Sequence, residues 1–204
     1  MDKINFLAKL PFLVIFISAI VTFISCAPIA SENAKENREY ISTGNYFKCN
    51  IPDDWNVYIP SGFGLSEEER KVYGGLFSGP YAEGQDSPEI SVYYYAPGNL
   101  LEKTMDVFIR RHAGTGFFEG RSYQEVKEIE FSGRKAKNFE SIRQRNLSGR
   151  VLNPVFVTIF QKFIVVPAKE GEGFYVLRLA VPFEIKDQYI GTFDEVSKSF
   201  VPSK

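Results

Sequence analysis

The sequence predicts an α+β fold, in which an antiparallel β-sheet of about six to seven strands carries helices on both faces. Residues 155–166 and 174–181 are apolar at nearly every position, which is typical of strands that are covered on both faces. Two further segments repeat apolar residues at helical spacing, and Gly- or Pro-containing turns separate shorter alternating runs. Because a sheet that is apolar on both faces must be covered on both, we expect helices on either side.

Residues 1–25 have the pattern of an export signal. Lys3 and Lys9 form a short positive head, residues 10–24 are almost entirely apolar, and the small residue Ser25 precedes Cys26. The segment resembles a bacterial lipoprotein signal, in which Cys26 becomes the lipid-bearing first residue of the mature chain. This resemblance implies a lipid anchor in the membrane.

Two other interpretations of this segment stay open. A permanent transmembrane helix needs roughly 20 apolar residues, and the run is shorter than that. An ordinary secretory cleavage after Ala27 would place Pro28 next to the cut, where its fixed φ suits a protease poorly. Within the lipoprotein interpretation, Phe23 stands where such signals usually carry Leu. Ala27 favours the outer membrane, on its periplasmic face, in a bacterium that has one.

The charge balance argues against nucleic-acid binding. After residues 1–25, the chain holds 22 basic and 24 acidic residues, whereas nucleic-acid binders are usually basic. Residues 31–102 carry 12 acidic and 5 basic residues, and residues 103–150 carry 11 basic and 6 acidic ones. Strand pairing is expected to disperse most of this asymmetry over solvated faces.

Residues 26–45 are predicted to form the lipidated Cys and a flexible tether, since they are polar and show no apolar period. The domain is expected to span residues 46–204. Its first strand alternates Phe47, Cys49 and Ile51 with polar residues, which places the Cys49 thiol on the buried side. If Cys26 is acylated, Cys49 has no disulfide partner within the chain.

The first half of the domain alternates strands and short helices. We expect a bent strand over residues 47–59, a helical turn capped by Ser66, and strands over residues 72–77 and 89–95. Asn99, three residues before Glu102, then predicts the cap of a helix. The apolar face of that helix consists of Leu101, Met105, Phe108 and His112.

The second half is predicted to be mainly antiparallel sheet. Residues 126–131 and 135–145 read as a hairpin around the turn Ser132-Gly133. Arg178 interrupts the strand over residues 174–181 and needs a carboxylate partner or a place at the open end of the sheet. The helical spacing of Ile185, Tyr189, Phe193 and Val196 then predicts a helix lying on the sheet.

These features together carry a resemblance to the PsbP-like family, over roughly residues 46–202. The residues concerned are Phe47 to Trp55 at the start, the run Gly173-Phe174-Tyr175-Val176-Leu177-Arg178, and the closing helix with Ser199-Phe200. The resemblance implies an α/β/α sandwich. It also implies a binding or assembly role, since family members act as extrinsic subunits of membrane complexes and a relative of the same fold binds a small GTPase. It brings no catalytic residues.

Taken together, these observations predict a non-enzymatic, membrane-anchored lipoprotein that binds or helps to assemble a protein complex of the cell envelope. The candidate partner-binding residues follow the first long helix, where aromatic and Arg side chains gather around a Gly-rich loop. They are Phe117, Phe118, Arg110, Arg111 and Arg121. The two phenylalanines could instead fold back onto the helix.

The alternative function is a small-ligand carrier or a hydrolase with a pocket at one end of the sheet. Hydrolysis requires a nucleophile beside a base, or a metal cluster. One helix-face histidine and one buried thiol supply neither, although paired carboxylates could still meet in space. We therefore predict no catalytic residue, no metal and no cofactor.

Overall fold

The structure is a computed structural model that describes residues 36–59, 64–80, 86–113, 122–123, 125–146, 156–169 and 173–203. Residues 35–204 form one compact unit. Cys26, Phe117, Phe118 and Arg121 lie outside the described residues. None of the helices in the described ranges is long and apolar enough to cross a membrane.

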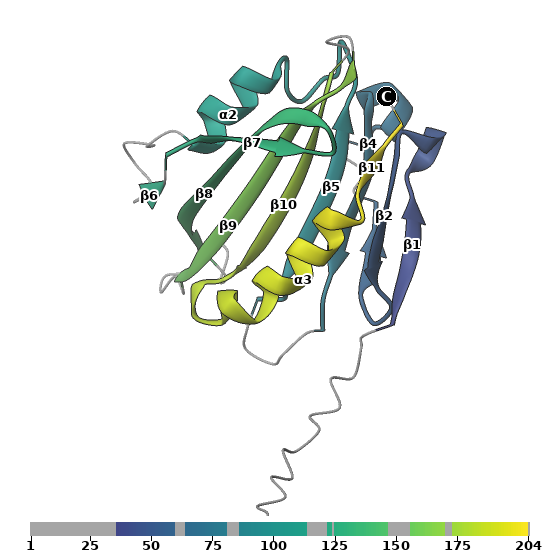
Figure 1. Ribbon diagram of the computed structural model, residues 1–204. Helices are drawn as coiled ribbons and strands as arrows, with labels where there is room; N and C mark the ends of the chain where they lie inside the picture. Colours follow the sequence, from purple (N-terminus) through teal and green to yellow (C-terminus); the bar gives the residue numbers. More distant parts are fainter. Residues whose placement is uncertain are drawn as a thin grey trace, which may run out of the picture. The chain divides into compact units, whose positions relative to one another are not determined.

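An eight-stranded antiparallel sheet forms the centre of this unit (Figure 1). Its strands lie in the order β3-β4-β5-β10-β9-β8-β6, and β7 pairs with β8 beside this path. Their bounds are β3 (Asn56–Tyr58), β4 (Val72–Ser78), β5 (Glu89–Tyr95), β6 (Ser122–Tyr123), β7 (Lys127–Phe131), β8 (Arg134–Asn146), β9 (Phe156–Pro167) and β10 (Phe174–Pro182). The predicted fold class is confirmed.

Strands β9 and β10 are the central pair, as their apolar sequences predict. β10 pairs with β9 on one side and with β5 on the other. Its side chains alternate between two hydrophobic clusters: Tyr175 and Leu177 belong to the larger one, Phe174 and Val176 to the smaller. The sheet is therefore buried on both faces along β10, because the period of a strand is two residues.

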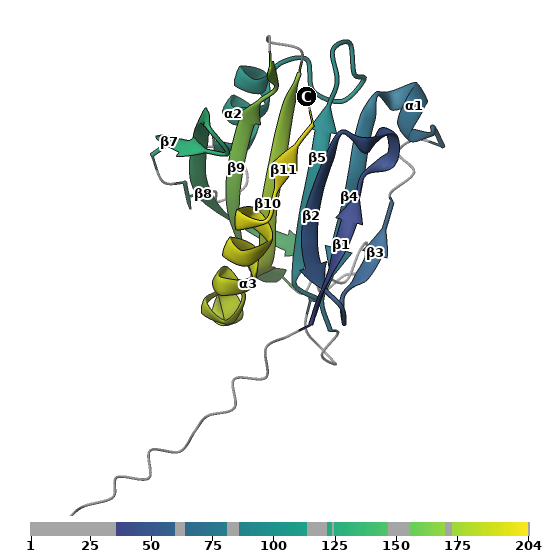
Figure 2. The same ribbon diagram turned by 45° about the vertical axis from the view of Figure 1, so that its right-hand side comes forward.

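The larger cluster is covered by α3 (Lys186–Lys198) and by a second sheet (Figure 2). This small sheet has the order β1-β2-β11. Its strands are β1 (Asn37–Ile41), β2 (Phe47–Pro52) and β11 (Val201–Pro202), and the short turn η3 (Phe183–Ile185) precedes α3. The predicted inward residues Phe193 and Val196 of α3 are buried, as are Phe47 and Cys49 of β2.

The start of the domain corrects the sequence prediction. Residues 37–45, predicted as part of the tether, form β1 and the turn η1 (Thr43–Asn45), and β1 pairs with β2 over its whole length. The ring of Tyr40 packs against Phe77, with 4.9 Å between ring centroids. The Ser42 hydroxyl accepts hydrogen bonds from the backbone N–H groups of Tyr46 and Phe47. The segment is polar because it lies at the edge of a sheet, where one neighbouring strand supplies its hydrogen bonds.

The smaller cluster is covered by α2 (Met105–Ala113), whose buried residues are Phe108 and Ala113. Asn99 does not cap this helix, contrary to the prediction. Its side chain instead stabilises the loop before the helix. Asn99 Oδ1 accepts hydrogen bonds from the N–H groups of Leu101 and Glu102, and Asn99 Nδ2 donates to the carbonyls of Ala96 and Glu102. The Thr104 hydroxyl accepts from the N–H of Val107, so Thr104 caps the helix.

Two local predictions are confirmed. Ser66 and Glu69 form a reciprocal capping box at α1 (Glu67–Arg70). Ser132 and Gly133 both have positive φ, 49° and 70°, in the two-residue turn between β7 and β8. Such a turn matches the twist of the flanking strands.

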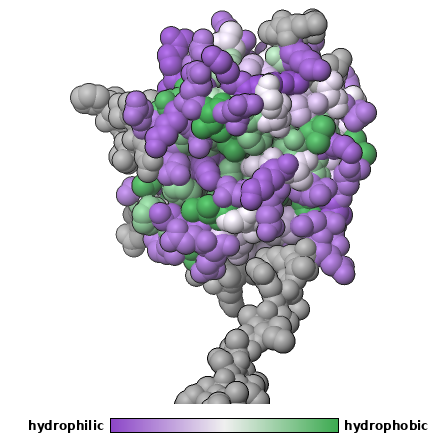
Figure 3. All heavy atoms as spheres, viewed as in Figure 1, coloured by the Kyte–Doolittle hydropathy of each residue, from purple (hydrophilic) through white to green (hydrophobic). Residues whose placement is uncertain are grey.

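On the face of the domain that carries α3, hydrophilic residues dominate and apolar ones form small separate patches (Figure 3).

Candidate binding site at the end of helix α2

The face of the main sheet under α2 is half apolar and half polar. α2 has nine residues and is about 14 Å long, while the thirteen residues of β8 extend for about 43 Å. A helix of this length covers less than half of the strand. Most positions that follow the apolar half on the same face are polar, although Val157, Ile159 and Ala180 also lie there. We call the polar positions the polar floor: Ser91, Ser141, Arg143, Arg145, Gln161 and Arg178.

The apolar half is packed with aromatic rings. Tyr95 and Phe174 stack with 4.9 Å between centroids and 7° between planes, and Phe139 stacks on Phe163 at 4.7 Å. The ring of His112 lies 4.2 Å from that of Phe108. His112 therefore packs on the apolar face of α2, as its helical spacing predicts.

Ion pairs cross one side of the polar floor. Arg145 Nη1 lies 2.7 Å from Asp86 Oδ2, and Arg145 Nη2 lies 3.6 Å from Glu89 Oε2. Arg178 Nη2 lies 3.7 Å from the same Glu89 oxygen. The carboxylate partner expected for Arg178 is thus Glu89, which two arginines share. All four side chains are partly buried, so solvent screens these pairs less than it screens surface pairs.

A small cavity lies between the last turn of α2 and strands β8 and β9. Its volume is about 110 Å³, and Arg111, His112, Ser141, Arg143 and Gln161 line it. Ser141 and Gln161 are 5% and 3% exposed. The Ser141 hydroxyl donates to Gln161 Oε1 at 3.4 Å, while the Gln161 amide nitrogen is buried and has no hydrogen-bond partner among the described residues.

Glu102 contacts two residues that line this cavity, Arg111 and His112. Arg111 Nη1 lies 2.6 Å from Glu102 Oε1, and His112 Nε2 lies 4.0 Å from the same oxygen. Burial raises the pKa of the Glu102 carboxyl above its usual value, although the charge and hydrogen bond of Arg111 partly offset this effect. The carboxylate orients the Arg111 guanidinium and, when ionised, balances its charge.

The predicted partner-binding residues are only partly placed by the structure. Arg110 and Arg111 are both exposed on the last turn of α2. Phe117, Phe118 and Arg121 lie outside the described residues.

Sequence reasoning missed the residues of the opposite wall of the cavity, Ser141, Arg143 and Gln161. One signal could have revealed them, because Gln161 interrupts the apolar run of β9 at a position that faces α2.

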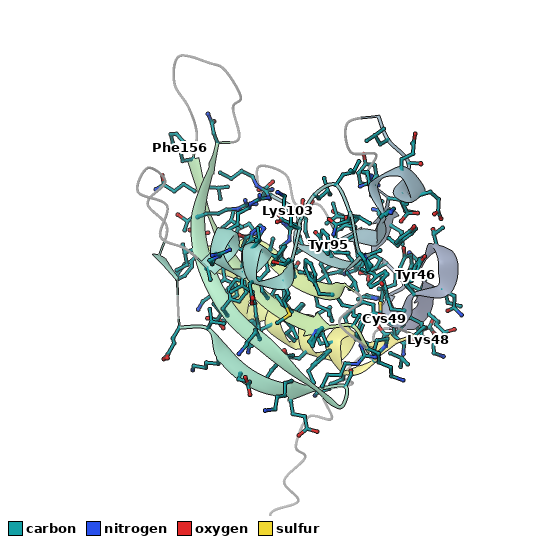
Figure 4. All side chains as sticks on the ribbon, turned by 90° about the horizontal axis from the view of Figure 1, so that it is seen from above. Tyr46, Lys48, Cys49, Tyr95, Lys103 and Phe156 are labelled. Atoms are coloured by element: carbon teal, nitrogen blue, oxygen red, sulfur yellow. The ribbon has the colours of Figure 1, made fainter. Side chains whose placement is uncertain are left out.

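A second cavity, of about 390 Å³, lies at the end of the sheet where α2 begins. It is lined by the loop before α2 and the ends of β9 and β10, including Tyr95, Asn99, Lys103, Asp106 and Phe174. Tyr95 and Lys103 lie near the middle of Figure 4, away from Lys48 and Cys49 of the small sheet. This is the place where the alternative function requires a pocket.

Cys49 and His112, the thiol and the imidazole singled out from the sequence, lie on opposite faces of the main sheet. Cys49 belongs to the cluster under α3, and burial raises the pKa of its thiol to about 12. His112 packs against Phe163 of the other cluster. Within the described ranges, no group of three His, Cys, Asp or Glu side chains is arranged to hold a metal ion.

Comparison with known proteins finds similarity in solved structures. No family model and no curated protein matches the chain. LpqN of Mycobacterium tuberculosis, described as involved in cell envelope biogenesis, is 13% identical with a TM-score of 0.43, covering 81% of this chain and 91% of LpqN.

Two further structures match over similar lengths. CyanoP, the cyanobacterial PsbP of Synechocystis, is 14% identical with a TM-score of 0.47, covering 82% of this chain and 93% of CyanoP. The Ran-binding protein Mog1p of Saccharomyces cerevisiae is 10% identical with a TM-score of 0.47, covering 82% of this chain and 96% of Mog1p. The fold class stated for this chain rests on its own strand order and helix packing.

Proposed function

We propose that this chain is a non-enzymatic lipoprotein of the cell envelope, anchored through Cys26, whose domain binds a protein partner and helps to assemble an envelope complex. The observation that carries the proposal is the apolar segment that ends at Ser25-Cys26 shortly before the first strand. Such a segment is typical of a lipoprotein export signal. The anchor would lie on the periplasmic face of the outer membrane in a bacterium with two membranes, because Ala27 follows the cysteine.

The start of β1 limits how far the domain reaches from the membrane. Nine residues separate Cys26 from Glu36, and even a fully extended segment of this length spans at most about 36 Å. A spacer that ran to Tyr46 would reach about twice as far. We therefore place the partner close to the membrane surface, within reach of a domain held at the beginning of β1.

Cys49 and His112, the two candidates for covalent chemistry that the sequence singles out, have structural surroundings, which supports a binding role. The Cys49 thiol is buried with a strongly raised pKa, and a thiol must ionise to act as a nucleophile. His112 packs between aromatic rings on the other face.

The last turn of α2 is the binding surface that we assign to the partner. Arg110 and Arg111 are exposed there, and Arg111 lines a cavity together with residues of the polar floor. Arginine is enriched where proteins contact one another. The partner surface would be acidic, since guanidinium groups pair with carboxylates in a bidentate manner.

Mass spectrometry of the mature N-terminus tests the anchor. Acylated Cys26 is the expected result, whereas an unmodified N-terminus at Ala27 or beyond, or an intact chain from Met1, contradicts it.

The docking surface is tested by a pair of charge reversals, Arg110→Glu and Lys198→Glu. Each residue is an exposed cation in the last turn of its helix, and the two helices lie on opposite faces of the sheet. Affinity purification from native membranes should recover one stoichiometric envelope protein with the wild type and with Lys198→Glu, and lose it with Arg110→Glu. Equal recovery with both variants would move the docking surface elsewhere.

The cavity at the end of the sheet favours a second candidate function, the carriage of a small ligand. Its volume of about 390 Å³ lies within the range of pockets that bind small molecules. Mass spectrometry of small molecules extracted from protein purified under native conditions tests this candidate, and a compound recovered in a one-to-one ratio would support it.

A further inference from the structure

We propose that the 110 Å³ cavity at the end of α2 is a binding site for one small oxyanion, a carboxylate or phosphate group held by Gln161, Ser141 and Arg143. The proposal concerns the folded domain and does not depend on the lipid anchor.

Among the described side chains that line this cavity, hydrogen-bond donors outnumber acceptors. The guanidinium groups of Arg111 and Arg143 offer only N–H groups, and an arginine side chain contains no acceptor. Gln161 uses its oxygen to accept from Ser141, which leaves its amide N–H groups as donors. A ligand that satisfies this lining must be rich in acceptors, and an oxyanion is the simplest such group.

Gln161 is the residue that most favours a specific ligand. Its side chain is buried in the middle of β9, and the amide nitrogen has no partner among the described residues. A buried donor without a partner destabilises the folded state by about 1–3 kcal/mol. Such groups are rare in folded proteins, and a ligand or a water molecule that completes the hydrogen bond is one explanation for them.

The charges around the cavity also favour an anion. Arg111 and Arg143 line it, while Glu102 lies beside Arg111 and balances one positive charge. The carbonyl end of α2 contributes a partial negative charge, equivalent to roughly half an elementary charge. Over these described groups, the two guanidinium charges, the Glu102 carboxylate and the helix end sum to about half a positive elementary charge, before any protonation of His112.

The volume matches a single small group. One water molecule occupies about 30 Å³ in the liquid, so 110 Å³ corresponds to roughly three or four waters. A carboxylate or a phosphate has a comparable number of heavy atoms. The cavity is too small for a drug-sized molecule, which needs about 300 Å³ or more.

The experiment is a titration of the domain with phosphate, acetate and chloride at constant ionic strength, followed by calorimetry and by NMR of the Gln side-chain amides. We expect saturable binding of phosphate or acetate but not of chloride, with the largest shift at the Gln161 amide. The two oxyanions are measured separately, so the titration also decides between a phosphate and a carboxylate.

Matched variants connect the binding to this cavity. Gln161→Met removes the buried N–H groups at similar volume and should weaken oxyanion binding at least tenfold, since hydrogen bonds to charged groups are among the strong ones. Gln144→Met is the control, because Gln144 is exposed on β8 outside the cavity. It should bind like the wild type.

Three outcomes would overturn the proposal. They are binding of neither oxyanion in preference to chloride, affinity within twofold of wild type in Gln161→Met, and a ligand-induced shift that is no larger at Gln161 than at Gln144. The last measurement uses the wild type alone, so it decides the question even if Gln161→Met does not fold.

Discussion

Replacing Tyr40 tests whether residues 37–45 belong to the folded domain. The Tyr40 ring lies 4.9 Å from Phe77 and 6.0 Å from Phe47, measured between centroids. Its hydroxyl oxygen is buried and has no hydrogen-bond partner among the described residues, and burial raises the pKa of the phenol to about 12. The ring therefore contributes packing, and the hydroxyl contributes little or destabilises.

Tyr40→Ala should lower the free energy of unfolding by about 2–3 kcal/mol. A fully buried phenylalanine costs about 3–5 kcal/mol when truncated to alanine, and Tyr40 is only partly buried. For a domain of this size the expected fall in the melting temperature is about 4–12 °C. Tyr40→Phe is the matched control and should stay within about 0.5 kcal/mol of the wild type, or gain slightly, because no hydrogen bond is lost.

Urea denaturation at constant pH measures both variants, with the slope m as a check that the unfolded states are comparable. A loss below about 0.5 kcal/mol in Tyr40→Ala would refute the reasoning. In that case residues 37–45 would behave as the predicted tether, and the domain would begin at Tyr46.

Three further perturbations follow from the structure. Cys49 should resist thiol reagents in the native domain and react once denaturant is added, because its buried thiol has a pKa of about 12. Glu102→Gln should be more stable relative to the wild type at pH 7 than at pH 4. The reason is that burial raises the pKa of this carboxyl in the folded state above the ordinary 4.5. In the wild type, ionisation of Glu102 therefore lowers the free energy of unfolding above the folded-state pKa, whereas below the unfolded-state pKa the carboxyl is neutral and costs nothing. Gly74→Ala should destabilise strongly, because φ is +137° and the new Cβ would lie 2.0 Å from the Val92 carbonyl oxygen.

Each of these predictions has a contradicting result. Rapid native labelling of Cys49 would contradict its burial. If the stability of Glu102→Gln relative to the wild type decreases as the pH rises from 4 to 7, the attraction of Arg111 outweighs the desolvation of the Glu102 carboxylate. Gly133→Ala is the control for Gly74→Ala, since φ is +70° there but no atom lies within 4 Å of the new Cβ. Its cost should be only the left-handed penalty of about 1–2 kcal/mol, and an equal cost at the two sites would contradict the steric argument.

The elements that the sequence predicts well are those whose packing repeats along the chain. β9 and β10 bury most of their side chains, and α3 buries its side chains at helical spacing. Their patterns can therefore be read without knowledge of their neighbours. The turn Ser132-Gly133 and the capping box at Ser66 are also local, since every group that forms them lies within a few residues. The buried side of Cys49 follows from strand alternation alone.

The start of the domain and the start of α2 could not be read in this way. β1 has the sequence NREYI, and it becomes a strand only because β2 supplies its hydrogen bonds. Asn99 and Glu102 match a capping box, but the loop uses the Asn99 side chain for four other hydrogen bonds. A motif of two residues does not reveal which backbone groups compete for the same side chain.

By itself, the sequence determined the class of the fold, its central strands and the closing helix, because these depend on apolar periods that each segment carries alone. The resemblance to a lipoprotein signal at Cys26 is also a property of the sequence, and it stays a prediction. Only the tertiary structure decided which polar residues meet. Arg111 and His112 come from α2, Ser141 and Arg143 from β8, and Gln161 from β9. The physical reason is strand register: Ser141 faces Gln161 because β8 and β9 pair in one antiparallel alignment, and a shift of β8 by one residue would turn Ser141 to the other face of the sheet, away from Gln161.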